Sequence, residues 1–96
     1  MFSDFFGTNL KSFRLDGNTY VCKIAAPEAT REDVEVTFSG NYLIVEVKET
    51  ESYAKRVAYV IIPARANRKK TKAKVNNGMI VITMSDGNDD LKVDVE

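Results

Sequence analysis

The sequence predicts an all-β fold, an antiparallel immunoglobulin-like β-sandwich of seven to eight strands. Short segments with alternating apolar and polar residues recur along the chain, and turn residues separate them at regular intervals. No helical 3.6-residue period is long enough to compete with this pattern. The third observation is the pair Asn77-Gly78 between two strand-like segments, since both residues accept the positive φ of a type I′ hairpin turn.

The hairpin around this pair, residues 73–84, organises the chain. Before the turn, Ala73 and Val75 alternate with lysines, so this arm has one apolar and one polar face. After the turn, residues 79–84 are almost wholly apolar, which is typical of a buried strand. We therefore expect an edge strand that pairs with a core strand.

The other expected strands lie earlier in the chain and are bounded by turn residues and prolines. The predicted strands are residues 11–15, 19–25, 34–38, 43–48 and 57–62. Residues 16–18 and 39–41 contain glycine and asparagine and are expected to form tight turns. Pro27 and Pro63 are expected to end strands, because proline cannot donate a ladder hydrogen bond.

The chain length and the pattern predict one domain with short extensions. With 96 residues, we expect a sandwich domain over residues 11–84, an apolar N-terminal arm over residues 1–10 and a C-terminal tail over residues 85–96. Lysine plus arginine and aspartate plus glutamate both total 14, so no net charge recruits nucleic acid or anionic lipid. We expect no membrane association.

The residue types argue against an enzyme. The chain has no histidine, which removes serine and cysteine triads and imidazole acid–base chemistry. Cys22 is the single cysteine, is expected to be a small buried hydrophobe, and fits a reducing, cytoplasmic setting. The acidic spacing in residues 86–90 resembles a calcium loop but lacks its glycine and its later glutamate. We expect no cofactor and no metal site.

Residues 18–84 resemble the α-crystallin domain of the small heat-shock protein family. The family has an Ala-x-x-x-Asn-Gly-Val-Leu-x-Ile signature at its last hairpin, and the matching residues here are Ala73, Asn77, Gly78, Met79, Ile80 and Ile82. Residues 24–27 and 31–36 resemble the family's apolar strand, Pro-Gly, charged connector and alternating strand. Ile62-Pro63 resembles its Leu-Pro, and residues 93–95 resemble its C-terminal Ile-x-Ile/Val tail.

Three departures from the family pattern are informative. Only residues 49–56 lie where bacterial and plant members have a long loop with a strand exchanged between partners, so strand exchange there is not expected. Ala58 replaces a usual arginine, and Glu28 replaces the glycine of Pro-Gly. The short loop also resembles CS-domain co-chaperones, but their tryptophan-containing signature is missing.

The resemblance implies an ATP-independent holdase that binds exposed hydrophobic segments of unfolding client proteins. In the family, two edge strands flank the binding groove. By position, the candidate groove residues, or core residues beneath the groove, are Val34, Val36, Phe38, Ala73 and Val75. An extended segment can add to such edges by β-augmentation.

Both termini are candidates for assembly into a homo-oligomer through edge strands and terminal segments. Phe2, Phe5 and Phe6 form either an adhesive arm or a cap that folds back on the domain's own core. Val93 and Val95 either enter the groove of a neighbouring copy or pair as a final strand of their own domain.

Two other functions remain open. The first is a CS-like adaptor or structural module that docks one defined protein partner. The second is weak, non-specific nucleic-acid binding through the basic residues Arg65, Arg68, Lys69, Lys70, Lys72 and Lys74. This run lacks a glycine-rich cradle and interleaved aromatics, so a solvated face that protects an edge strand is the alternative interpretation.

Overall fold

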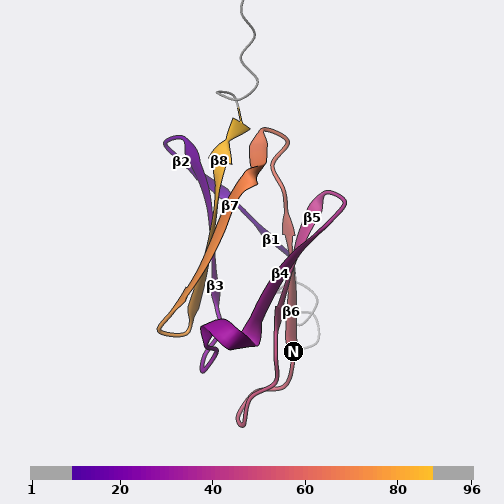
Figure 1. The fold of residues 1–96 in the computed structure, drawn as a ribbon, viewed down its shortest axis with the longest axis vertical. Coiled ribbons are helices and arrows are strands. Elements are labelled where there is room, and N and C mark those ends of the chain that lie inside the picture. The colour runs from indigo at the N-terminus through magenta and orange to yellow at the C-terminus, as the bar shows by residue number, and fades with distance from the viewer. Residues whose placement is uncertain (1–9, 88–96) are drawn as a thin grey trace, which may run out of the picture.

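Two four-stranded sheets lie face to face in the computed structural model, which describes residues 10–87 (Figure 1). The first sheet has the order β1-β6-β5-β4 and the second β2-β3-β8-β7. The strands are β1 (Leu10–Ser12), β2 (Arg14–Asp16), β3 (Thr19–Ala25), β4 (Val34–Ser39), β5 (Tyr42–Val47), β6 (Arg56–Ile61), β7 (Ala66–Asn76) and β8 (Met79–Asp86). One 3₁₀ turn, η1 (Arg31–Asp33), precedes β4. The predicted β-sandwich is confirmed.

The terminal residues singled out in the sequence lie outside the described residues. These are Phe2, Phe5 and Phe6 in the N-terminal arm, and Val93 and Val95 in the C-terminal tail.

The first predicted strand, residues 11–15, is wrong in one respect, because the chain changes sheets inside it. β1 pairs with β6 of the first sheet, whereas β2 pairs with β3 of the second (Figure 1). Phe13 lies at the crossing and packs against the core, while the side chain of Leu15 is 54% exposed. The β1–β6 pair is parallel, so the sandwich is not wholly antiparallel.

The predicted hairpin at residues 77–78 is confirmed. Asn77 has φ 53° and Gly78 has φ 73°, as a type I′ turn requires, and Asn76 pairs with Met79 across it. The Gly78 carbonyl also accepts a 2.7 Å hydrogen bond from the Ala26 N–H. The signature turn therefore joins the β7–β8 hairpin to the end of β3.

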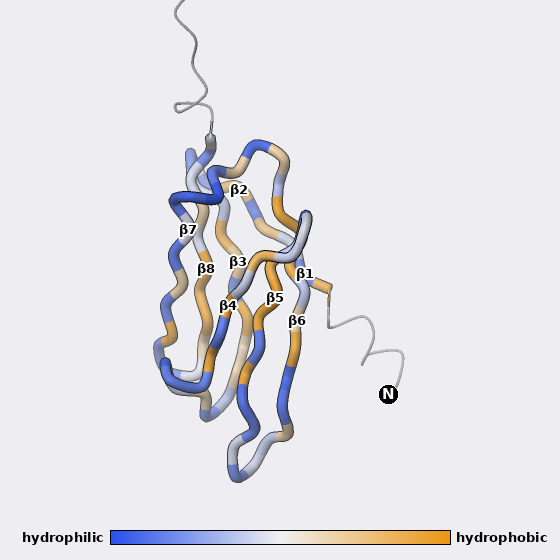
Figure 2. Tube along the Cα trace, turned by 45° about the vertical axis from the view of Figure 1, so that its right-hand side comes forward, coloured by the Kyte–Doolittle hydropathy of each residue, from blue (hydrophilic) through white to orange (hydrophobic). Residues whose placement is uncertain are grey.

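The core lies between the sheets and follows the predicted alternation. Its fully buried large side chains are Leu43, Val45, Val60, Ile80, Ile82 and Met84. Figure 2 shows the contrast within the last hairpin, where β8 is largely hydrophobic and β7 largely hydrophilic. The expected edge-strand and core-strand pair is confirmed, since β7 ends the sheet and β8 lies between two strands.

Both strands of the last hairpin extend beyond the predicted segments. β7 begins at Ala66, with a register shift between Asn67 and Thr71, and β8 continues through Ser85 to Asp86. Ser85 pairs with Thr19 as well as with Asn67, so neighbours on both sides support the extension. The last strand therefore runs two residues into the segment that was expected to be the C-terminal tail.

Candidate binding groove

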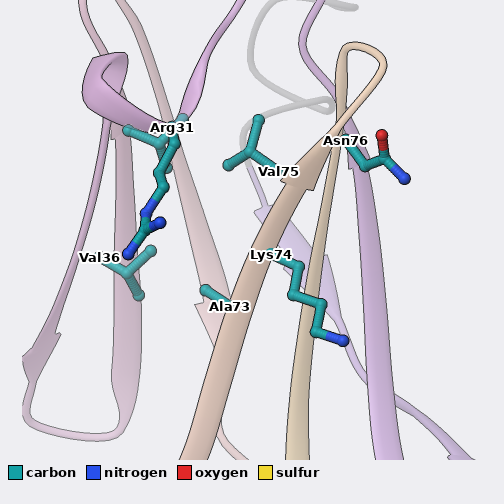
Figure 3. Close-up of a pocket in the computed structure, with 7 residues that line it drawn as sticks. Arg31, Val36, Ala73, Lys74, Val75 and Asn76 are labelled. Atoms are coloured by element: carbon teal, nitrogen blue, oxygen red, sulfur yellow. The ribbon is translucent and has the colours of Figure 1, made fainter.

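The β4–β7 groove lies between the edge strands of opposite sheets. Among the described residues, β4 pairs only with β5 and β7 only with β8, so each strand has one unpaired backbone edge. The volume between them is about 680 Å³. The groove is lined by Arg31, Val34, Val36, Ala73, Lys74, Val75 and Asn76 (Figure 3).

Strand alternation turns the apolar side chains of both edges toward each other. Val36 pairs with the buried Val45, and Ala73 pairs with the buried Ile82, so both face between the sheets. In Figure 3, Val36 and Val75 extend into the space between the strands, whereas Lys74 extends away from it. The groove thus has an apolar floor that continues the core and a charged outer rim.

One end of the groove is formed by the η1 turn, which carries Arg31. The N–H and the hydroxyl of Thr30 each donate a 3.0 Å hydrogen bond to Asp33 Oδ2. The backbone bond from Thr30 is the largest cause that holds the pKa of Asp33 below its ordinary value. This capping box fixes the turn before β4, so Arg31 is held at the groove.

The structure brings four of the five sequence-predicted groove residues together and leaves Phe38 out. Val34, Val36, Ala73 and Val75 line the groove, but Phe38 is not part of its lining. Phe38 lies near the β4–β5 turn, is 46% exposed, and has the guanidinium carbon of Arg68 5.6 Å from its ring centroid. Alternation alone assigns a face and does not reveal where along the strand the groove ends.

The outer face of the first sheet carries an apolar patch that sequence reasoning missed. Tyr59 pairs with Leu10 on one side and Ile44 on the other, and Ile61 pairs with Tyr42. Four of these five side chains are exposed large hydrophobics. The available signal was the unbroken apolar run at residues 57–62, because a strand with one wet face would alternate.

The basic run forms a separate hollow on the β7 side of the second sheet. Its volume is about 410 Å³, and Lys69, Lys70 and Lys72 line it together with hydroxyl-bearing residues. Arg65 instead pairs with Asp86 at 3.6 Å, and Arg68 lies over Phe38. The basic residues therefore do not form one continuous surface: three lysines line the hollow, while Arg65 and Arg68 contact other side chains.

The remaining chemistry within residues 10–87 is sparse. No group of three or more His, Cys, Asp or Glu side chains in this part of the chain could hold a metal ion. Cys22 is buried, and burial raises the pKa of its thiol although the charge of Lys11 acts to lower it. No helix in the same residues is long and apolar enough to cross a membrane.

Comparison with known families identifies this fold. The model of a family described as "HSP20-like domain found in ArsA" matches residues 17–84. The chain belongs to this family. Its matched span begins in the β2–β3 turn and ends near the close of β8, so it covers the strands that form the β4–β7 groove. A comparison with curated protein sequences finds no match.

Solved structures of small heat-shock proteins share the HSP20-like fold. HSP18.5 from E. histolytica matches with a TM-score of 0.69 and 21% identity, over 88% of this chain and 92% of that chain. A small heat-shock protein from Xylella fastidiosa matches with a TM-score of 0.69 and 18% identity, over 77% of this chain and 81% of that chain. Heat shock protein 16.0 from Schizosaccharomyces pombe matches with a TM-score of 0.65 and 18% identity, over 77% of this chain and 69% of that chain. The resemblance to the α-crystallin domain is confirmed.

Proposed function

We propose that this HSP20-like domain is an ATP-independent holdase that binds exposed hydrophobic segments of unfolding proteins. The observation that carries the proposal is the β4–β7 groove, in which an apolar floor lies between two unpaired strand edges. An extended client segment can hydrogen-bond to an edge and place alternate apolar side chains on the floor. The proposed binding is non-covalent throughout.

The groove favours weak and reversible binding. Full burial of one valine-sized side chain contributes roughly 1.5–3 kcal/mol, and part of this is offset by the ordering of the segment. A client that offers one or two apolar side chains to Val36 and Val75 would therefore dissociate readily. Useful retention would come from several grooves acting together in a homo-oligomer.

Assembly would use edge strands and the terminal segments. Val93 and Val95 have the spacing that places two apolar side chains on one face of an extended segment, which suits the groove of a neighbouring copy. Phe2, Phe5 and Phe6 would add apolar surface for clients or for other copies. The buried, unpaired thiol of Cys22 favours a cytoplasmic setting for this activity.

The test is heat-induced aggregation of several unrelated client proteins without ATP. We expect suppression by the unmodified chain and a marked loss in Val36→Lys, which places a charge on the groove floor. Thr37→Lys is the matched control, because it adds the same charge to the next residue of β4 on the exposed face. Equal suppression by both variants would remove the groove from the proposal, and no suppression of any client would overturn the holdase.

A second candidate is an adaptor or structural module with one defined protein partner. Two observations favour it: the family's description names ArsA as a protein in which such domains are found, and the apolar patch around Tyr59 is a second exposed surface. An adaptor would bind a single partner and protect no unrelated client. Loss of that binding in Tyr59→Lys, with Val36→Lys unaffected, would support the adaptor over the holdase.

A further inference from the structure

A second opening between the sheets lies on the side opposite the β4–β7 groove. Strands β1 and β2 close this side only in part, because each is three residues long. β1 covers β6 at residues 59–61, and β2 covers β3 at residues 19–21. Beside the uncovered halves of β6 and β3 lies a cavity of about 230 Å³, the Arg56 pocket.

The Arg56 pocket is aliphatic except for two cationic side chains. Ile24, Val45 and Val47 supply its inner wall, and the cations are Lys11 and Arg56. No acidic side chain is among the lining residues. The charges of the pocket therefore have no counter-ion within its own wall.

Arg56 is held in place by two contacts that leave part of its guanidinium free. Its Nη1 donates a 3.2 Å hydrogen bond to the Pro27 carbonyl, and its Cζ lies 4.7 Å from the ring centroid of Tyr53. Its Nε and Nη2 are buried and donate to no protein group within residues 10–87. Buried donors of a charged group without an acceptor are costly, and Arg56 lines the pocket, so an acceptor that reaches this group would be favoured.

Lys11 contributes the second charge from the neighbouring strand. It pairs in register with Val60, which is fully buried, so its side chain starts toward the space between the sheets. Cys22, which is buried between the sheets, also senses this charge. Burial raises the pKa of its thiol, and the positive charge of Lys11 partly offsets that rise. Lys11 and Arg56 therefore present positive charge to one aliphatic cavity from two adjacent strands.

We propose that the Arg56 pocket binds a carboxylate carried on a short aliphatic body. A carboxylate offers acceptors for the free guanidinium donors and the ammonium group, and charge-assisted bonds of this kind are the stronger ones. A cavity of ~150 Å³ accepts benzene, so the larger pocket has room for a leucine-sized body. This chemistry is shared by a free branched-chain acid and by the C-terminal residue of a polypeptide. The site is independent of the proposed holdase groove.

The test is a titration of the full chain, followed by the amide signals in ¹⁵N NMR spectra. The probe is 4-methylpentanoate, and 4-methylpentanamide is the neutral control of the same shape. We expect shifts at Ala25, Ala26, Val57 and Ala58, which line the pocket, and at least ~10-fold weaker binding of the amide. Equal binding of acid and amide, or no shift with the acid, would overturn the proposal.

Charge-removing variants locate the site. Arg56→Gln and Lys11→Gln should each weaken binding of 4-methylpentanoate by ~10-fold. Lys23→Gln removes the same charge from the exposed face of β3 and should leave this binding unchanged. Lys11→Gln keeps the Pro27 and Tyr53 contacts of Arg56. It therefore still tests the charge of the pocket if Arg56→Gln unfolds. Equal weakening by Lys23→Gln, or none by Lys11→Gln, would overturn the assignment.

A peptide arm distinguishes the two sources of the carboxylate. A short peptide that ends in leucine is compared with its C-terminally amidated form in the same titration. Tighter binding of the acid peptide than of the free acid assigns the pocket to polypeptide C-termini, and the reverse assigns it to small acids. If neither carboxylate causes a shift, the pocket does not bind this chemistry.

Discussion

The two long sides of the sandwich are built in opposite ways. On one side, β4 and β7 remain separate strands, and the β4–β7 groove stays open between them. On the other side, the chain crosses from β1 to β2 through Phe13 and ties the sheets together covalently. The difference between the two sides is therefore that a short chain segment spans the gap on one of them, while two unpaired strand edges face the gap on the other.

The largest expected effect tests the side that the β1–β2 segment spans. Phe13→Ala should lower the free energy of unfolding by about 2–3 kcal/mol, because a partly buried aromatic ring is lost from the point where the chain joins both sheets. Leu15→Ala, two residues later and mostly exposed, should change it by less than ~0.5 kcal/mol. Urea denaturation measures both. Equal effects would mean that Phe13 does not hold the crossing.

The next effect concerns the basic hollow beside the open side. If nucleic acid binds there through about three phosphate contacts, affinity should fall by ~40-fold between 50 and 200 mM salt. Fluorescence anisotropy with two unrelated oligonucleotides measures this fall, and Lys72→Gln should reduce its slope. Binding that prefers one sequence and survives the higher salt would contradict a non-specific electrostatic mode.

A smaller effect concerns the connection that leads from β3 toward β4. Glu28 has φ 69°, a conformation that glycine adopts without steric cost. Glu28→Gly should raise the free energy of unfolding by roughly 0.5–1 kcal/mol, despite the loss of the 3.0 Å bond from the Thr50 hydroxyl to Glu28. Thr50→Ala measures that bond separately. A destabilised Glu28→Gly with a neutral Thr50→Ala would show that the backbone is not strained there.

The smallest effect is a pH dependence at the end of the open groove. Hydrogen bonding from Thr30 keeps the pKa of Asp33 below its unfolded value, so this stabilisation is present above about pH 4 and is lost as the pH falls through the folded pKa. Melting temperatures of the unmodified chain and Asp33→Asn should therefore differ at pH 7 and converge toward pH 3. Glu35→Gln, on the outward face of β4, is the matched control. A constant difference across this range would contradict the capping role.

Much of the fold was predictable because local rules agree with the tertiary structure. The β7–β8 turn needed two residues with positive φ, and the sequence placed Asn77 and Gly78 there. The strand over residues 19–25 was predicted with its observed bounds, because Gly17 and Pro27 mark its ends. The alternation in β5 likewise predicted which of its side chains are buried.

The remaining features depend on contacts between distant segments. The split of residues 11–15 between two sheets follows from pairing with β6 and β3, which no local pattern encodes. The groove was predicted by face but not by extent, so Phe38 was included and Arg31 was missed. The Arg56 pocket was not predicted, because it exists only where two short strands leave the halves of two longer ones uncovered.

The parallel pairing of β1 also bears on the order in which the molecule folds and opens. Leu10 meets Tyr59 across about fifty residues of chain, whereas β4–β5 and β7–β8 are joined by tight turns. Closing the longer loop costs more entropy than closing a tight turn, so we expect β1 to dock after β5 and β6 have formed their own pair. Each of the two short end strands, β1 and β2, has three residues and one neighbour, so their amide hydrogens should be the first strand amides to exchange in the native state.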